Sequence, residues 1–590
     1  MTWNCILFQT LTNKIAMKYR KKCYGRIGVV LAMGISVMTF LQPVLAEDGK
    51  PAQSDHVDSA QANDAEFNAI LDAEEVKSLR KSAEQGDADA QFKYGVMFEF
   101  GRGVTKDYVE AMKWYRKAAD QGNTHAQFNV GAMFANGHGV PSDATEATKW
   151  FMKAAEGGDV LVQDAIGNAF AGEVGGLPKD LVEAVKWYRK AAEKGNADAQ
   201  MRLGFAYLKG VGGIVKNDAE SVKWLHKAAE KGNSCAQRGL GFAYVHGLGG
   251  LVKDDAKAAK WYRKAAEQGD SIAQDEMGNA FAQGRGGLAK DFSEALKWYH
   301  KAAEQGNADA QRNLGIAYAD GVGGVAKDSA ESVKWFRKAA DQGDALAQDQ
   351  MGFAFAYGIG GISKDLVEAV KLFRKSAEQG NADAQMRLGY AYANGAGGIG
   401  KDEVESVKWF HKAAEGGDAE AQERMGFAYV HGVGGITKND IEALKWYRKA
   451  AEHGNAYAQQ NLGYAYETGI GGVAKDEVEA AKWYRKSAEQ GDALSQKCLG
   501  SMLVNGRGVP KDEVEAVKWV RKAAEQGNAD AQGKLGYMLF TGRGISKDEV
   551  EAVKWYWKAA AQGDKYAKDV LKNLGIDQQQ KSTAAPSIAK

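Results

Sequence analysis

One short stretch constrains the fold of this chain more than any other feature. The nine residues AEQGNADAQ occur three times without a change, at residues 303–311, 377–385 and 524–532, and a variant, AEQGDADAQ, begins at Ala83. Alignment on the glycine of this stretch gives fourteen copies, spaced 36 or 37 residues apart. A fixed period of this length is typical of a solenoid, in which each repeat packs only on its neighbours. The period therefore predicts one array of repeats over residues 64–575.

Each repeat is expected to hold two helices. The glycine is followed by Asp or Asn in all fourteen copies, as at Asn381, and this residue type caps the first turn of a helix. We call that helix A and count its positions from the Asp or Asn as zero. A second Asp or Asn, such as Asp402, opens helix B, which carries Trp at one fixed position in twelve of thirteen copies. Position eight of helix A is glycine in thirteen copies, as at Gly389, and we expect the Trp of helix B, here Trp409, to pack against it.

This pattern resembles the Sel1-like repeat family, a branch of the tetratricopeptide-like α-solenoids, over about residues 63–575. In one copy, the residues that carry the resemblance are Ala384, Leu388, Gly389, Tyr392, Gly395, Trp409, Ala413 and Ala414. The resemblance implies an all-α fold, a right-handed α-solenoid of about 13 antiparallel helix pairs, whose general role is to hold other proteins. Exported bacterial members are implicated in envelope assembly, signalling and host contact.

The start of the chain has the layout of a secretory signal peptide, residues 1–46. A basic segment begins at Met17, which is a second candidate start, an apolar run covers residues 27–40, and small residues precede Glu47. The alternative is an uncleaved anchor, because residues 27–46 are just long enough to span a bilayer. We predict cleavage, a disordered linker over residues 47–63 and a disordered tail over residues 576–590. The mature protein would be periplasmic or secreted, with no membrane span.

Charge and cysteine content exclude further classes. Residues 1–46 contain six basic and no acidic residues, so their removal would change the formal charge from +1 to −5. A weakly acidic chain without a basic stripe argues against nucleic acid as a partner, since that affinity depends on neutralised phosphates. Only Cys235 and Cys498 follow the signal segment, and two thiols so far apart in the sequence do not form a disulfide framework.

No pattern in the chain indicates catalysis, a metal or a cofactor. HExxH, CxxC and GxSxG do not occur, and no two histidines have metal-ligand spacing. Two SxxK matches, residues 78–81 and 587–590, lack the SDN and KTG motifs of β-lactamases and penicillin-binding proteins. Those activities have been assigned to cysteine-rich relatives and remain a minority alternative; we expect a protein that is not an enzyme.

Partner-binding residues are expected on helix A. In tetratricopeptide-like solenoids the concave face is lined by helix A at positions two, five, nine, twelve and thirteen. Seven aromatic residues at position nine would form a ladder for an extended segment, and the alternative is that they fill gaps between successive A helices. The candidate residues are Phe205, Phe242, Phe353, Tyr390, Phe427, Tyr464 and Tyr537 at position nine, Arg238 and Arg312 at position five, and His246, Tyr357 and His431 at position thirteen.

The sequence thus predicts a monomeric, exported scaffold that binds a protein partner on its concave face, in assembly or regulation of the cell envelope. The alternative is a secreted factor that interacts with a host. The identity of the partner does not follow from the residues.

Overall fold

The computed structural model describes residues 73–172 and 178–576. Within these residues the chain forms 28 α-helices and two short 3₁₀ helices, and no strand. The predicted all-α fold is therefore confirmed. The predicted signal peptide, the linker and residues 577–590 of the predicted tail lie outside the described residues. No helix among the described residues has the length and apolar character needed to cross a bilayer.

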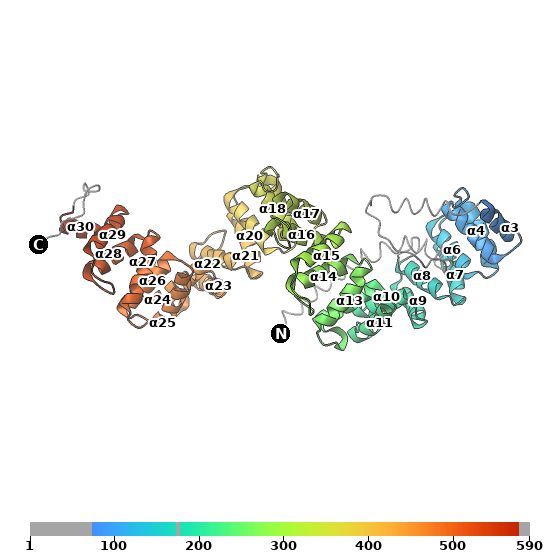
Figure 1. The fold of residues 1–590 in the computed structure, drawn as a ribbon, viewed down its shortest axis with the longest axis horizontal. Helices are drawn as coiled ribbons and strands as arrows, with labels where there is room; N and C mark the ends of the chain where they lie inside the picture. The colour runs from blue at the N-terminus through green and yellow to red at the C-terminus, as the bar shows by residue number, and fades with distance from the viewer. Residues whose placement is uncertain (1–72, 173–177, 577–590) are drawn as a thin grey trace. The chain divides into compact units, whose positions relative to one another are not determined.

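The described residues divide into two compact units, one before and one after the boundary between Asn307 and Ala308. Figure 1 shows their helices in chain order. In unit 1, helix α3 (Ala73–Glu84) precedes six A–B pairs. The pairs are α4 (Ala88–Phe100) and α5 (Tyr108–Asp120), α6 (Thr124–Asn136) and α7 (Ala144–Glu156), α8 (Val160–Ala171) and α9 (Leu181–Glu193), α10 (Ala197–Lys209) and α11 (Asp218–Glu230), α12 (Ser234–His246) and α13 (Asp255–Glu267), and α14 (Ser271–Gln283) and α15 (Phe292–Glu304). The 3₁₀ helix η1 (Leu248–Gly250) lies in the loop between α12 and α13.

Unit 2 holds seven further pairs and ends with α30 (Lys565–Asn573). The pairs are α16 (Ala308–Asp320) and α17 (Ser329–Asp341), α18 (Ala345–Tyr357) and α19 (Leu366–Glu378), α20 (Ala382–Asn394) and α21 (Glu403–Glu415), α22 (Ala419–His431) and α23 (Asp440–Glu452), α24 (Ala456–Thr468) and α25 (Glu477–Glu489), α26 (Ala493–Asn505) and α27 (Glu513–Glu525), and α28 (Ala529–Thr541) and α29 (Glu549–Ala561). The 3₁₀ helix η2 (Ile470–Gly472) lies between α24 and α25.

Within each unit, helix A packs on the helix B that follows it, and helix B packs on the next helix A. The corner between repeats is built as the sequence predicts. Gly380 has a left-handed φ of +92°, which ends α19, and the side chain of Asn381 accepts a hydrogen bond of 2.8 Å from the amide of Ala384 in the first turn of α20. Because this corner is local and repeated, the nine-residue stretch is a structural element and not a binding motif.

The predicted contact between the position-eight glycine and Trp is wrong by one residue. A Cβ atom built on Gly389 would lie 2.5 Å from the ring of Phe410, which directly follows Trp409. The same holds for Gly95 and Tyr115, whose ring atom would lie 2.7 Å away. Adjacent residues of a helix point about 100° apart, so only one of the two rings can face helix A at this point. The residue after Trp therefore explains why the glycine recurs.

The Trp side chains point away from the position-eight glycine, in a different direction from the residue that follows them. Trp409 belongs to a buried cluster with Ala384 and Leu388 of its own helix A. In all twelve copies with Trp, the lysine three residues later places its Nζ atom between 3.8 and 4.9 Å from the centre of the indole ring. The ammonium group thus lies over one face of the indole ring, where a cation–π contact stabilises it.

Candidate partner-binding surface

Positions two, nine and thirteen of helix A lie on one side of the helix, since they are seven and four residues apart. We call the surface formed by these positions in successive A helices the A-helix face. Several of its large apolar or aromatic side chains are at least 40% exposed. They are Leu161, Leu346, Tyr457, Leu494 and Tyr566 at position two, Ile316, Tyr464 and Tyr537 at position nine, and Tyr357 at position thirteen. The residues at position two, which we did not single out from the sequence, vary from copy to copy, and that variation was the available signal.

The seven predicted aromatic residues at position nine divide into two groups. Tyr464 and Tyr537 are exposed, by 48% and 40%. The other five, Phe205, Phe242, Phe353, Tyr390 and Phe427, are half-buried. Five of the seven rings therefore lie partly within the helix stack, whereas Tyr464 and Tyr537 are open to solvent.

Tyr390 shows how a half-buried ring joins two repeats. Its ring centre lies 5.1 Å from that of Phe410 in the following helix B. Its hydroxyl donates a hydrogen bond to the carboxylate of Glu420 and accepts one of 3.1 Å from Nε of Arg424, both on the next helix A. Burial and the bond to Glu420 raise the pKa of Tyr390 to about 12. Tyr390 is thus partly structural, and its substitution would disturb the stack as well as the surface.

The predicted residues at position thirteen pair with the ring four residues earlier. The ring centres lie 4.2 Å apart for Phe242 and His246, and 4.6 Å apart for Phe353 and Tyr357. The pair of Phe427 and His431 has the same 4.2 Å separation. Tyr357 is 68% exposed, the most exposed ring of the set. Each pair presents one half-buried and one outer ring, an arrangement that suits an apolar side chain of a partner.

Arg238 and Arg312 at position five require a correction. Arg238 is 1% exposed, and its Nε donates a hydrogen bond of 3.0 Å to Asp270. Arg312 is paired with Asp344 at 2.9 Å and with Asp309 at 3.1 Å. Asp270 and Asp344 are the N-caps of the next A helices, so both arginines tie one repeat to the next. The guanidinium group of Arg238 is buried and unavailable to a partner, whereas the side chain of Arg312 is 20% exposed and half-buried.

Other position-five residues form buried ion pairs that the sequence analysis did not identify. Arg202 Nη1 lies 3.1 Å from Asp164, and both side chains are almost fully buried. Asp349 forms the corresponding pair with Arg387, 38 residues later. Burial raises the pKa of both carboxyl groups, and the arginines oppose this shift. The signal for these pairs was opposite charge at positions five and six of consecutive repeats.

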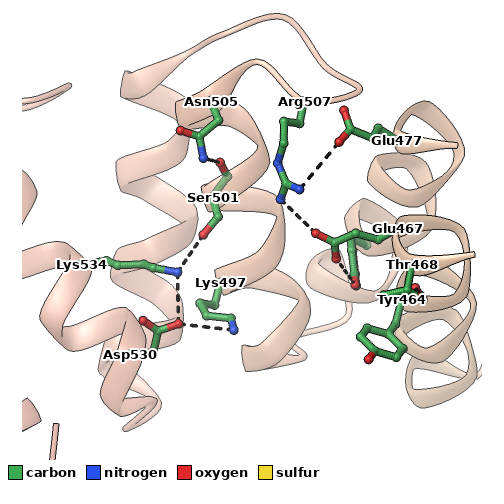
Figure 2. A network of polar contacts seen from close by, with 11 residues as sticks. Tyr464, Glu467, Thr468, Glu477, Lys497, Ser501, Asn505, Arg507, Asp530 and Lys534 are labelled. Carbon is green, nitrogen blue, oxygen red and sulfur yellow. Dashed lines mark hydrogen bonds and ion pairs between the residues drawn. The ribbon is translucent and has the colours of Figure 1, made fainter. Parts of the chain in front are cut away.

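Between the exposed Tyr464 and Tyr537, the intervening helix α26 places a serine at position nine. Figure 2 shows the polar network around this serine and the adjoining helices. Nζ of Lys534 donates to Ser501 Oγ at 2.9 Å and lies 3.1 Å from Asp530, which Lys497 also approaches to 3.4 Å. The aromatic row is therefore interrupted here by a polar spot that contains two lysines and one carboxylate.

The same network continues on the neighbouring side of α26, where Arg507 lies 2.9 Å from Glu467 (Figure 2). Glu467 also accepts a hydrogen bond of 2.9 Å from the hydroxyl of Tyr484, the ring that packs on the position-eight glycine Gly463. Buried Tyr484 thereby keeps its hydroxyl group satisfied. This half of the network joins Arg507, after α26, to Glu467 of α24, and Arg507 is about as exposed as Lys534, by 39% against 40%.

The described residues contain no cluster of three or more His, Cys, Asp or Glu that could hold a metal ion. Cys498 is a free thiol, and burial raises its pKa, which disfavours a reactive thiolate. Ser78 and Lys81 of the first SxxK match are both exposed on α3, and the second match lies outside the described residues.

Comparison with known proteins gives a consistent result. A family model described as the Sel1 repeat matches thirteen segments of the chain. They are residues 88–123, 124–159, 166–196, 197–233, 236–270, 271–307, 308–344, 345–381, 382–418, 419–455, 456–492, 495–528 and 529–564. No curated protein matches the chain.

Several solved structures are similar. A protective antigen present in uropathogenic Escherichia coli strains, which displays an SLR fold, is 35% identical; the match covers 85% of this chain and 90% of that one, with a TM-score of 0.47. A Sel1 repeat protein from Oxalobacter formigenes is 33% identical over 53% of this chain and 89% of that one, with a TM-score of 0.38. Cysteine-rich protein B of Helicobacter pylori is 26% identical over 23% of this chain and 96% of that one, with a TM-score of 0.19.

Proposed function

Because the chain belongs to the Sel1 repeat family, we propose that it is a scaffold that binds a protein partner through the A-helix face. The observation that carries this proposal is that some positions of helix A are the same in nearly every repeat while its exposed positions vary. The capping residue and the position-eight glycine recur in nearly every copy, whereas the exposed residues at positions two, nine and thirteen differ between copies. Exposed aromatic side chains at some of these variable positions, such as Tyr357, Tyr464 and Tyr537, suit recognition, since rigid aromatic side chains are enriched in protein interfaces.

The exposed rings define a test that leaves the stack intact. Tyr357, Tyr464 and Tyr537 are each at least 40% exposed, so their joint replacement by alanine should change helix content and unfolding little. The matched control replaces three exposed apolar residues of B helices, Val404, Val478 and Val514, by alanine. Affinity capture from cells that produce the protein should recover a partner with the wild type and the control, and at least tenfold less with the A-helix triple variant.

Recovery of the same partner by the A-helix triple variant and not by the control would move the site to the B helices and refute the proposal. The half-buried rings Phe353, Tyr390 and Phe427 are less suitable for this experiment, because their loss would also destabilise the repeats that they join.

We further propose that the scaffold is exported and acts in the cell envelope, on the basis of the signal-like layout of residues 1–46. Fractionation of producing cells should find the protein in the periplasm, shortened by cleavage before Glu47. Recovery from the medium, bound to a host glycoprotein, would instead support the secreted host-interaction factor.

The proposal includes the absence of catalysis. Its support is the lack of SDN and KTG motifs beside either SxxK match and the exposed positions of Ser78 and Lys81 on α3. The purified protein should not hydrolyse a chromogenic β-lactam. Turnover that disappears in a Ser78→Ala variant would establish the enzyme alternative.

A further inference from the structure

The B helices carry a regular pattern of charge that is broken once. Twelve of the thirteen have Glu three residues after the N-cap residue, and in ten of them this Glu forms an ion pair with the Lys three residues later. In α13 the position holds Lys257, which approaches the N-cap residue Asp254 to 3.5 Å. Lys260 therefore lacks the acidic neighbour that its counterparts have within their own helices.

This substitution makes α13 the most basic of the B helices. Counting the N-cap residue, α13 has four basic and three acidic residues, whereas in the other twelve B helices acidic residues equal or outnumber basic ones. The four cations of α13 are exposed. Together with Trp261 and Glu267, they line a shallow depression of about 380 Å³.

The floor of the depression is a half-buried aromatic ring. Lys264 Nζ lies 4.4 Å from the centre of the Trp261 ring, and His226 of the preceding helix B meets the ring edge at 5.9 Å between centres. The depression thus has an apolar floor and a cationic rim, which suits a ligand with carboxylates beside an apolar side chain.

The size of the cluster favours a short ligand. Lys257, Lys260 and Lys264 are spaced three and four residues apart, so they form one stripe about 10 Å long. An extended chain of three or four residues has the same length. In α11 and α15, the B helices before and after α13, acidic residues outnumber Lys and Arg, so a long polyanion would meet repulsion on either side.

We propose that the α13 surface binds a short acidic peptide segment of a protein partner. This site is separate from the A-helix face and does not depend on the function proposed for it. Carboxylates of the segment pair with Lys257, Lys260 and Lys264, while an apolar side chain rests on Trp261.

The repeat array supplies a matched control. Helix α23 has the same Lys, Trp, Arg, Lys arrangement, and His411 meets Trp446 at 5.7 Å between ring centres, as His226 meets Trp261. Glu442 of α23 stands where α13 has Lys257, and it pairs with Lys445 at 2.6 Å. The two helices differ in charge at this position and at the N-cap, where α13 has Asp254 and α23 has Asn439.

The test uses the full chain and a fluorescein-labelled peptide, Glu-Glu-Leu-Glu-Glu-Glu, followed by fluorescence anisotropy at about 50 mM salt. Lys257→Glu restores the residue of the other repeats and should fold normally, yet we expect it to weaken binding at least tenfold. Lys445→Glu changes the net charge by the same amount and should change the affinity less than twofold. Glu442→Lys should raise the stoichiometry from one peptide to two.

Equal affinity of the wild type and Lys257→Glu, or equal losses in Lys257→Glu and Lys445→Glu, would overturn the proposal, because binding would then follow net charge alone. A heparin tetrasaccharide and a twelve-nucleotide oligothymidylate serve as anions of other classes. If either binds in a way that requires Lys257 while the peptide does not bind, the assignment to an acidic peptide is wrong.

Discussion

The repeats that begin at Asp159 and at Asp344 share the same packing contacts, which we call the frame, and differ in the residue at position nine of helix A. In both, the position-eight glycine faces the residue after the Trp position: a Cβ on Gly167 would lie 2.5 Å from the ring of Tyr188, and a Cβ on Gly352 would lie 2.7 Å from the ring of Phe373. Both repeats also carry an aspartate at position five that pairs with an arginine of the next repeat.

The difference lies at position nine. In the first repeat this residue is Asn168, which is buried, accepts a hydrogen bond of 2.9 Å from the hydroxyl of Tyr188 and donates one of 3.4 Å to Asp164. In the second repeat it is Phe353, half-buried beneath the exposed Tyr357, and the hydroxyl of Tyr188 has no counterpart on Phe373. Phe373 has no hydroxyl group that needs a polar partner, so this repeat has no counterpart of the hydrogen bond between Tyr188 and Asn168.

The comparison shows that the residue at position nine can change while the frame, the glycine contact and the helix caps, stays the same. A buried hydrogen-bonded layer and a partly open aromatic pair are built on the same glycine contact and the same caps. The predictions below test how far this separation holds.

The largest effect is expected where the polar layer is most buried. Arg202 and Asp164 have side chains 1% and 4% exposed, so Arg202→Met leaves a buried carboxylate without its cation and should cost about 3–5 kcal/mol. Asp349 is 1% exposed, but its partner Arg387 is 31% exposed and therefore partly hydrated, so the ion pair lost in Arg387→Met is weaker and its loss should cost about 1–3 kcal/mol. Hydrogen exchange of the flanking helices measures both. Equal costs would erase the distinction between the two repeats.

A smaller loss of stability, equal in the two repeats, is expected when the position-eight glycine is replaced. Valine at Gly352 would drive its side chain into the ring of Phe373, and valine at Gly167 would do the same to Tyr188. Each variant should lose about 2–3 kcal/mol of free energy of unfolding. The clash with the ring costs more than is gained by replacing glycine with a residue of higher helix propensity. Local stability from hydrogen exchange should fall by similar amounts in both. A large loss in one and none in the other would show that the frame is not common to the two repeats.

The smallest of the stability effects concerns pH. Burial raises the pKa of Asp349 in the folded chain, so its protonated form is favoured by folding. The resulting stabilisation is complete below the unfolded pKa of about 3.9 and is lost as pH rises through the higher folded value. Relative to Asp349→Asn, which imitates the protonated form, the wild type should therefore become less stable between pH 4 and pH 7. Urea unfolding across this range measures the difference in free energy of unfolding between the wild type and Asp349→Asn. A wild type that gains stability relative to Asp349→Asn as the pH rises would contradict the prediction.

Much of the fold could be predicted because its determinants are local and repeated. The caps at Asn381 and its equivalents and the left-handed glycine before them depend on a few adjacent residues, and fourteen copies remove accidental matches. The glycine contact was assigned to Trp409 and not to Phe410, because both are large and adjacent, and only the rotational setting of helix B decides between them.

The candidate site was less predictable. Arg238 and Arg312 were expected at the surface because position five lines the concave face of tetratricopeptide-like solenoids, but their partners Asp270 and Asp344 come from the next repeat, 32 residues away. Exposure at position nine depends on neighbours in two repeats, which explains why Tyr464 is open while Tyr390 is half-buried.

The central claim is that a protein partner binds on the A-helix face. Photo-crosslinking tests it most directly, with p-benzoylphenylalanine placed at Tyr357 and Tyr464 on that face and at Val404 and Val478 on B helices, all of them at least 46% exposed. The account predicts crosslinks to one partner from the two tyrosine positions and none from the two valine positions. Crosslinks to that partner from the valine positions alone would contradict it.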